Sequence, residues 1–303
     1  MLLLGHIQYN YKEYTLMNEF IITGFSDEIS ADFDIQLEEI SKLGIAYIEI
    51  RGVDGKNISD HSIEEVDHIK AKLDAKKIGI SAIGSPIGKI HITEEFAPHF
   101  EKFKHTVAIA KRLGTQYIRM FSFFMEEGRA QDYRVEVLNR LKVMVDYAEQ
   151  EDIILLHENE KDIYGDVPER CLDLYKSMNS KHFKLIFDPA NFVQCGVQVY
   201  PNAFDMLKDY VVYYHIKDAL MATGEVMPSG FGDGRIADMI EQLKLREFKG
   251  FLSLEPHLGN FVGFSDLEGT GHMPQFDQTS DASKFALAYT SLKTIINKGE
   301  NHE

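Results

Sequence analysis

The sequence alternates short apolar runs with longer amphipathic stretches, and this alternation repeats eight times along the chain. Apolar runs bounded by polar residues are typical of strands that are buried on both faces, as in a parallel sheet covered by helices. The predicted strands are Phe20–Gly24, Ala46–Ile50, Ile78–Ile83, Tyr117–Phe124, Ile153–Glu160, Phe183–Asn191, Val211–Asp218 and Phe251–His257. The predicted helices are Ala31–Leu43, Ser62–Ala75, Glu94–Leu113, Asp132–Gln150, Pro168–Met178, Asn202–Lys208, Ile236–Leu245 and Ala282–Ile296.

This alternation predicts the fold class. Strands that alternate with helices imply right-handed crossovers and a parallel sheet, and eight such units close into a single (β/α)8 TIM barrel. An open sheet of six or seven strands is the alternative, and it requires one or two of the predicted strands to be wrong. Since no Pro-, Gly- or Ser-rich linker occurs, we expect one barrel domain over residues 17–303. Residues 1–16 are interpreted as a loose N-terminal extension without an assigned function.

Composition excludes several classes of partner. The chain has 303 residues, enough for a full core, and 48 Asp and Glu against 32 Lys and Arg give a net charge of −16. Such an acidic chain is a poor candidate for binding nucleic acid or an anionic membrane. The two cysteines, Cys171 and Cys195, form no disulfide framework, and no apolar run approaches the ~20 residues that span a bilayer. We therefore expect a cytoplasmic protein.

The last four predicted strands each end in a residue that can bind a metal, namely Glu158, Asp188, His215 and Glu255. In (β/α)8 barrels the carboxyl ends of the strands build the active site, so these four side chains could converge on one divalent cation. Three oxygen donors and one nitrogen suit Mn²⁺, Mg²⁺ or Co²⁺ better than a structural zinc, which prefers Cys and His. Each of these residues alone could instead be a helix cap or a salt-bridge partner. Four in succession favour a metal site at the ends of strands five to eight.

Two polar residues lie two positions beyond predicted ligands. Glu160 follows Glu158 and lies on the same side if the chain stays extended, so it is a candidate substrate contact. The alternative is a solvated loop carboxylate. His257 follows Glu255 and could support that ligand or contact substrate, whereas the alternative is a surface histidine.

Three basic residues are further candidates near the strand ends. Arg51 ends the second strand and could orient a carboxylate, a phosphate or a sugar hydroxyl, with an ion pair to Glu49 or Asp27 as the alternative. Arg119 lies within the fourth strand, where a structural ion pair with another strand is the better interpretation. Lys89 could neutralise an anionic substrate or be simply solvated.

The loop Gly224–Arg235 contains four glycines but no nucleotide-binding motif. It lacks the GKS/T ending of a P-loop and the spacing of GxGxxG, and we expect no organic cofactor. We interpret it as a mobile flap over the site. The loop Leu258–Asp281 is interpreted as a second flap or a dimer contact.

The polar strand ends also carry a family resemblance. Glu158 with Asn159, Asp188 in FDPAN, His215 in HIKD and Glu255 in LEP, together with FSDEIS, IEIRG and GEVMPSGFGDGRI, form the matching motifs. With them the chain resembles, from about Phe20 onward, the xylose isomerase-like superfamily of metal-dependent barrels. That superfamily includes sugar phosphate isomerase/epimerase proteins, ketose 3-epimerases, hydroxypyruvate isomerase, inosose dehydratase and endonuclease IV.

The resemblance implies a mechanism. In ketose 3-epimerases four such ligands hold one Mn²⁺ or Co²⁺, and the ion stabilises the enediolate formed when a proton leaves the carbon beside the carbonyl. Two glutamates on opposite faces of that carbon remove and deliver the proton. Glu158 and Glu255 match those positions and are the implied catalytic residues. Mn²⁺ is the expected ion, with Mg²⁺, Co²⁺ and Zn²⁺ as alternatives.

Two positions depart from the epimerase pattern. Epimerases carry His three residues after the Asp ligand, where this chain has Asn191, and Arg two residues after the His ligand, where it has Lys217. Both positions contact substrate in the epimerases, so the resemblance implies that Asn191 and Lys217 are substrate contacts here. The HIKD form looks closer to the inosose dehydratase branch.

These observations leave a ranked set of hypotheses. The leading one is a metal-dependent isomerase or epimerase that acts on a small polyhydroxy carbonyl compound, either a sugar or a sugar phosphate. The alternative is a lyase of the inosose or dehydroshikimate dehydratase type. The net charge of −16 and a single ligand set argue against an endonuclease, and the complete ligand set argues against a non-enzymatic barrel. Relatives are often dimers or tetramers, so a homo-oligomer is an open expectation.

Overall fold

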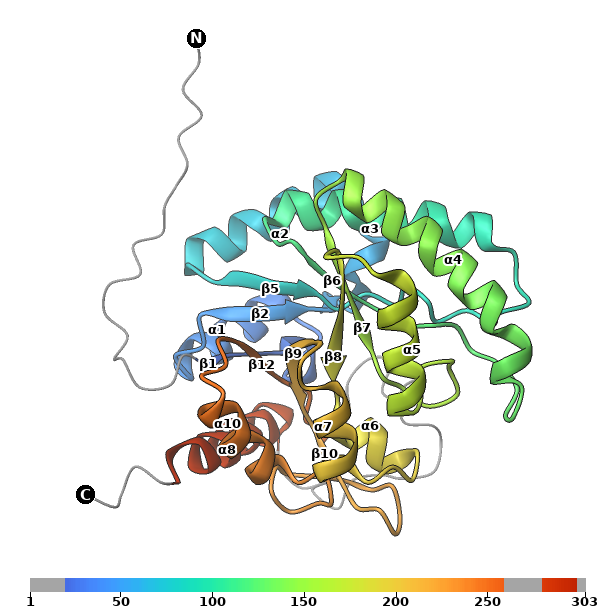
Figure 1. The fold of residues 1–303 in the computed structure, drawn as a ribbon. Coiled ribbons are helices and arrows are strands. Elements are labelled where there is room, and N and C mark those ends of the chain that lie inside the picture. The colour runs from blue at the N-terminus through green and yellow to red at the C-terminus, as the bar shows by residue number, and fades with distance from the viewer. Residues whose placement is uncertain (1–19, 259–279, 299–303) are drawn as a thin grey trace.

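A computed structural model, which describes residues 20–258 and 280–298, shows eight parallel strands in one nearly closed barrel surrounded by helices (Figure 1). The strands follow one another in the order β1-β12-β9-β8-β7-β6-β5-β2. The predicted (β/α)8 TIM barrel is therefore confirmed. The barrel strands are β1 (Phe20–Gly24), β2 (Tyr47–Ile50), β5 (Gly79–Ile83), β6 (Tyr117–Met120), β7 (Ile154–Glu158), β8 (Phe183–Phe187), β9 (Val211–Ile216) and β12 (Gly250–Leu254).

Helices cover the outside of the barrel between successive strands (Figure 1). They are α1 (Phe33–Lys42), α2 (Ile63–Lys76), α3 (Phe96–Leu113), α4 (Ala130–Gln150), α5 (Pro168–Met178), α6 (Pro189–Gln194), α7 (Phe204–Leu207), α8 (Ile236–Leu245) and α10 (Asp281–Asn297). Short helical turns are η1 (Ser26–Glu28), η2 (Ile58–Asp60) and η3 (Val199–Ala203). Two small hairpins pair β3 (Gly52–Val53) with β4 (Lys56–Asn57) and β10 (Asp218–Ala219) with β11 (Val226–Met227).

Several predicted elements are shorter in the structure, and three of them show why. The fourth strand ends at Met120 rather than Phe124, and Phe121 and Phe123 after it are buried in the following loop. The sixth ends at Phe187, because Asp188 caps α6 and Pro189 takes its first position, where the fixed φ of proline suits a helix start. The helix predicted over Asn202–Lys208 is split into η3 and the short α7.

The seam of the barrel lies between β1 and β2, which stand at opposite ends of the strand order. Within the described residues no backbone ladder joins these two strands, although they lie against each other. The hydroxyl of Thr23 on β1 instead donates to the backbone carbonyl of Tyr47 on β2 at 3.0 Å. On its other edge β1 pairs with β12, from Phe20 opposite Gly250 to Gly24 opposite Leu254.

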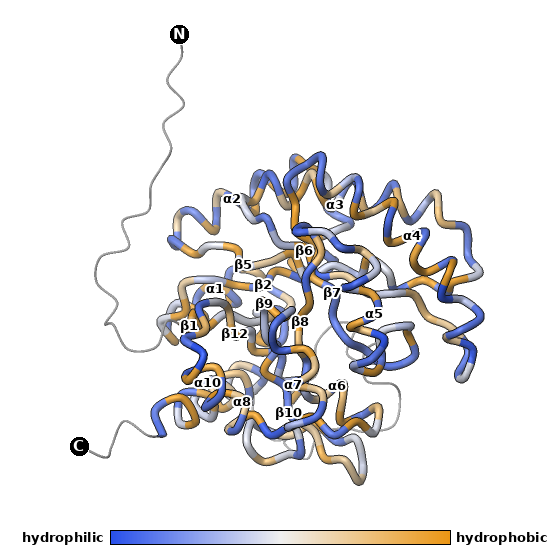
Figure 2. Tube along the Cα trace, in the orientation of Figure 1, coloured by the Kyte–Doolittle hydropathy of each residue, from blue (hydrophilic) through white to orange (hydrophobic). Residues whose placement is uncertain are grey.

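The core has two parts. A small cluster inside the barrel comprises Ala82, Leu156, Ile186 and Tyr213. A much larger one lies between the strands and the helices, and apolar colour accordingly follows the strands and one side of each long helix (Figure 2). Burial on both faces explains why the strands read as apolar runs rather than as alternating patterns.

Some predictions concern residues outside the described ranges. The N-terminal extension over residues 1–16 and all but the ends of the loop Leu258–Asp281 fall there. Both cysteines are described, and both are free thiols, as predicted. No helix in the described part of the chain is long and apolar enough to cross a membrane.

Candidate metal centre

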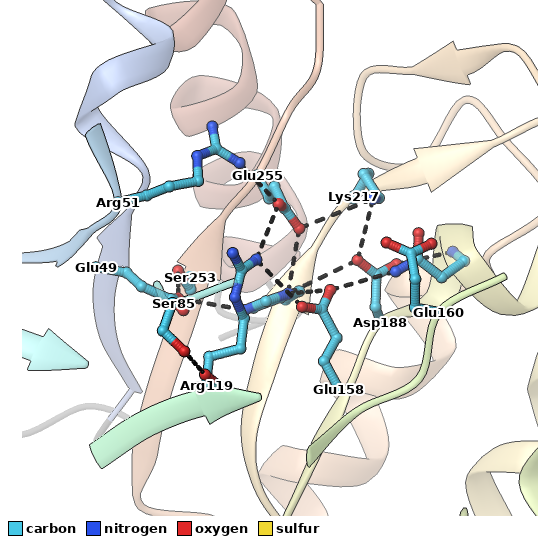
Figure 3. Close-up of polar contacts among 12 residues, drawn as sticks. Glu49, Arg51, Ser85, Arg119, Glu158, Glu160, Asp188, Lys217, Ser253 and Glu255 are labelled. Atoms are coloured by element: carbon cyan, nitrogen blue, oxygen red, sulfur yellow. Dashed lines mark hydrogen bonds and ion pairs between the residues drawn. The ribbon is translucent and has the colours of Figure 1, made fainter. Parts of the chain in front are cut away.

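The four predicted ligands meet at the carboxyl ends of four adjacent strands (Figure 3). Glu158 is the last residue of β7, Asp188 follows β8, His215 lies in β9 and Glu255 follows β12. All four are buried, and one ligand atom from each lies within 4.8 Å of the others. The topology explains this, because the last four barrel strands are consecutive neighbours and their carboxyl ends lie at one edge.

Nδ1 of His215 faces all three carboxylates. It lies 2.9 Å from Oε1 of Glu158, 3.2 Å from Oε2 of Glu255 and 3.7 Å from Oδ2 of Asp188. The opposite ring nitrogen, Nε2, faces away from the cluster toward Glu49 at 3.2 Å. One edge of the imidazole therefore belongs to the cluster and the other to the barrel interior.

The donor set fits a divalent cation. Oδ2 of Asp188 and Oε2 of Glu255 are buried and have no hydrogen-bond partner within the described residues. Buried carboxylate oxygens without partners are costly, and an ion at this position would compensate them. The only ammonium near both atoms among the described residues is that of Lys217, at 3.4 Å from Asp188 and 3.8 Å from Glu255. These four residues could hold a metal with hard oxygen ligands and one imidazole.

Asp188 is both a helix cap and a member of the cluster. Its Oδ1 accepts the backbone N–H of Asn191 at 2.9 Å, while its Oδ2 points toward His215. Capping was the competing interpretation of this residue, and here one carboxylate serves both purposes. The side chain of Asn159 fixes the turn, because it accepts the N–H of Asp188 and donates to its carbonyl.

Arg51 is buried against three acidic residues. It donates to Asp27 at 2.8 Å, to Glu28 at 3.3 Å and to Oε1 of Glu255 at 3.1 Å. The predicted alternative of an ion pair with Asp27 is confirmed. Glu49, the other partner considered, points into the barrel toward His215.

Arg119 bridges the two glutamates of the cluster. Its Nη1 lies 3.2 Å from Oε2 of Glu158 and 3.4 Å from Oε1 of Glu255, so the predicted ion pair between strands is confirmed. Both Arg119 and Arg51 place their guanidinium groups near the Phe25 ring, at 4.8 Å and 4.4 Å from its centroid. Each glutamate thus turns one oxygen toward His215 and the other toward arginine.

Glu160 lies beside Asp188 (Figure 3), and Asn191 contacts Glu158. The Asn191 amide donates to Oε1 of Glu158 at 3.2 Å and to the Asn159 carbonyl at 2.9 Å. Glu160 is only 7 % exposed and accepts from Lys89 at 3.1 Å, so the interpretation of a solvated loop carboxylate is wrong. Lys89 is likewise paired rather than simply solvated, and it lies over the Phe121 ring.

His257 is buried beneath Glu255, so its interpretation as a surface histidine is also wrong. Its Nε2 lies 3.3 Å from Oε1 of Glu255 and 3.6 Å from Oε1 of Glu28, and its backbone N–H donates to Glu28 at 2.8 Å. Burial opposes protonation, but these two carboxylates raise the pKa of His257 to about 9. Burial also raises the pKa of Glu28 to about 7.

The two cluster glutamates have opposite electrostatic surroundings. Burial raises the pKa of Glu158, partly offset by His215. Burial acts in the same direction on Glu255, but the charges of Lys217, His257 and His215 outweigh it and hold its pKa well below the usual range.

The glycine loop is tied to the end of β9. The carboxylate of Asp218 accepts the backbone N–H groups of Gly230 at 2.8 Å, Gly232 at 3.1 Å and Gly234 at 2.8 Å. A Cβ at Gly232 would come within 2.4 Å of Asp218 Oδ1. The glycines therefore allow the loop to approach this carboxylate closely.

Sequence reasoning missed Glu49 and Glu28 as neighbours of the site. Glu49 is fully buried in β2, and Glu28, in η1, is 3 % exposed. A single acidic residue within the apolar strand YIEI was the available signal, because an ionisable side chain is rarely buried without partners.

Comparison with known proteins identifies the family. Residues 37–279 match the model of the xylose isomerase-like TIM barrel family, so the chain belongs to that family. No protein of curated function matches the sequence significantly.

Three solved structures share the fold over nearly their whole length. The probable 3-DHS dehydratase AsbF of Bacillus anthracis is 17 % identical with a TM-score of 0.65, covering 88 % of this chain and 97 % of that chain. The IOLI protein with a bound zinc atom is 16 % identical with a TM-score of 0.70, covering 93 % and 99 %. A D-allulose 3-epimerase from Methylomonas sp. is 16 % identical with a TM-score of 0.68, covering 92 % and 99 %. At such identities the likeness establishes the fold alone.

Proposed function

We propose that this protein is a divalent-metal-dependent isomerase or epimerase that acts on a small sugar or sugar phosphate. The observation that carries the proposal is the convergence of Glu158, Asp188, His215 and Glu255 within 4.8 Å at the mouth of the barrel. Membership of the xylose isomerase-like family and the likeness to an epimerase support it. We favour Mn²⁺ as the ion, with Mg²⁺, Co²⁺ and Zn²⁺ as alternatives.

The proposed chemistry requires an acidified C–H bond and two carboxylates. An ion held by the four residues would act as a Lewis acid on the substrate carbonyl. One of Glu158 and Glu255 removes the proton from the carbon next to that carbonyl, and the other delivers a proton to the opposite face. Arg119 bridges both glutamates at 3.2 Å and 3.4 Å and so keeps them in a fixed relation during the transfer.

Substrate selection is assigned to the residues around the cluster. Lys217 and Asn191 correspond to the epimerase Arg and His by the family resemblance, and they contact Asp188 and Glu158 here, while Glu160 is paired with Lys89. Arg51 and His257 contact Glu255, so they would act on substrate mainly through that carboxylate.

A dehydratase is the second candidate. The ammonium of Lys217, between Asp188 and Glu255, stands where an epimerase carries arginine, and an AsbF-type dehydratase shares the fold. Loss of a proton next to a carbonyl is common to both reactions, and they differ in whether water then leaves from the adjacent carbon.

Proton NMR of products formed in D₂O separates these candidates. The Mn²⁺-loaded protein is incubated with free and phosphorylated ketoses, inososes and dehydroshikimate, and metal and protein are removed before each spectrum. We expect deuterium at the carbon next to the carbonyl together with a new stereoisomer or positional isomer. Loss of water with a new enone or dione signal would assign the protein to the dehydratases. No deuterium in any compound of this panel would contradict the proposed function.

A further inference from the structure

Among the described residues, Glu49 is the carboxylate that contacts the ring edge of His215 opposite the cluster. It lies on β2, across the barrel from β9, and it is fully buried. Its Oε2 is 3.2 Å from Nε2 of His215 and also accepts hydrogen bonds from the Tyr213 hydroxyl at 2.9 Å and the Ser253 hydroxyl at 2.7 Å. Two hydroxyl donors and one ring nitrogen, from two strands, therefore meet at one carboxylate oxygen.

These contacts define what each edge of the imidazole can do. A histidine nitrogen binds a metal only without its proton, and neutral imidazole carries a proton on just one of its two nitrogens. If Glu49 accepts the proton of Nε2, the lone pair of Nδ1 points at Glu158, Glu255 and Asp188. Such a partner behind a ligating histidine fixes the tautomer and makes the ligand more basic.

The surroundings of the ring and of Glu49 restrict the alternatives. Phe25 and Tyr213 stand nearly perpendicular to the imidazole, with centroids at 5.4 Å and 5.9 Å, so the ring is packed from two directions. The Tyr213 hydroxyl is itself held by Ser81 at 3.0 Å, and Ser81 lies 2.9 Å from the Thr23 hydroxyl. A chain of hydroxyl groups thus runs through the barrel to Glu49 and supports its position.

We propose that Glu49 is a positioning residue for the metal centre, which holds the Nε2 proton of His215 so that Nδ1 is available as a ligand. This inference rests on the metal site of the proposed function but does not depend on the substrate or the reaction. Glu49 would not touch the ion or the substrate. Its effect would be exerted on metal affinity through His215.

The first test is a calorimetric titration of the metal-free protein with Mn²⁺. We expect Glu49→Gln to weaken Mn²⁺ binding about 10- to 100-fold, the range found for such supporting residues. Glu136→Gln makes the same substitution at a half-exposed glutamate on α4, away from the cluster, and is the matched control, with unchanged Mn²⁺ affinity expected. An unchanged Mn²⁺ affinity in Glu49→Gln would overturn the proposal, as would a wild-type protein that binds no Mn²⁺.

The second test needs no variant of Glu49 and covers the case in which that variant does not fold. In ¹⁵N-histidine-labelled protein loaded with diamagnetic Zn²⁺, we expect a slowly exchanging Nε2–H signal, assigned to His215 by its absence in His215→Gln. A proton on Nδ1 instead would contradict the proposal. Neither readout involves substrate. If the wild type binds Mn²⁺ more tightly than Glu49→Gln but shows no activity, only the proposed reaction is refuted.

Discussion

At the residue scale, each cluster glutamate divides its two oxygens between a ligand position and an arginine. Glu158 turns Oε1 to His215 and Oε2 to Arg119, while Glu255 turns Oε2 to His215 and Oε1 to Arg51 and Arg119. The arginines fix the rotation of each carboxylate, so the oxygens toward His215 are presented to an ion in a defined direction. A glutamine at either position would place an amide where a charged oxygen belongs.

We therefore predict that Glu158→Gln or Glu255→Gln lowers deuterium incorporation into substrate at least ~100-fold, the usual minimum for loss of a general acid or base. The rates are measured with metal at saturating concentration for each variant, since both residues are also proposed ligands. Glu136→Gln, a substitution of a half-exposed glutamate on α4, is the control and should retain the wild-type rate. Full exchange activity in either cluster variant would show that the proton-transfer assignment is wrong.

The convergence of the four cluster residues could be predicted from sequence because each lies at or next to the end of an apolar strand, and parallel strands bring such ends to one edge. The supporting residues could not, because their contacts cross the barrel. Glu49 on β2 meets His215 on β9, and no local pattern says that these two strands face each other. The pairing of Arg51 with Asp27 could be predicted, whereas its contact with Glu255 could not, because the two residues lie 204 positions apart in the sequence.

At the element scale, apolar runs predicted where strands lie better than where they end. The run Tyr117–Phe124 continues past β6 because Phe121 and Phe123 are fully buried in a loop, so apolarity reflected burial rather than strand structure. The loop Gly224–Arg235 has no apolar pattern. It is held to Asp218 by hydrogen bonds from backbone N–H groups, and the sequence does not indicate which backbone groups form such bonds.

The close contact between this loop and Asp218 leads to a prediction for Gly232. A methyl group there would meet Asp218 Oδ1 at 2.4 Å and the Ala219 carbonyl at 2.6 Å, so Gly232→Ala should lower the free energy of unfolding by about 1–3 kcal/mol. Urea denaturation measures the change. In an Asp218→Ala background the same substitution should cost less, because one of the two clashing groups is gone. Equal costs in both backgrounds would show that the clash with Asp218 is not the cause.

The β5–α3 loop makes a prediction about pH. His99 on α3 accepts the backbone N–H of Gly88 at 2.7 Å, and burial lowers its pKa to about 4. Because the unfolded chain takes up this proton first, the contribution of His99 to stability is complete above about pH 6.5 and is lost as the pH falls toward 4. Between pH 7 and 4 the wild type should lose about 2–3 kcal/mol more than His99→Gln, which keeps an acceptor without the titration. If the free energy of unfolding, measured by urea denaturation, changes with pH by the same amount in both proteins, this prediction is wrong.

At the scale of the whole molecule, the cluster draws its residues from four strands, so an ion bound there would stabilise the entire barrel. Ligand that binds only the folded state at about 100 times its Kd adds ~2.7 kcal/mol, which corresponds to a rise of several degrees in Tm. We predict that Mn²⁺ raises Tm and that EDTA reverses the effect. Asp188→Asn keeps the oxygen that caps α6 but removes the charge, so it should abolish the shift while the metal-free protein stays folded. An undiminished shift in that variant would place the ion elsewhere.

The pairing of β1 with β12 also sets an order of events during synthesis. The edge of β1 that faces β12 has no backbone partner until Gly250, opposite Phe20, has been synthesised. Contacts between residues so distant in sequence form slowly. Glu255 lies directly after the same closing strand. Glu255 is thus the last cluster member to be synthesised, and the cluster becomes complete only when the strand that pairs with β1 has also been made.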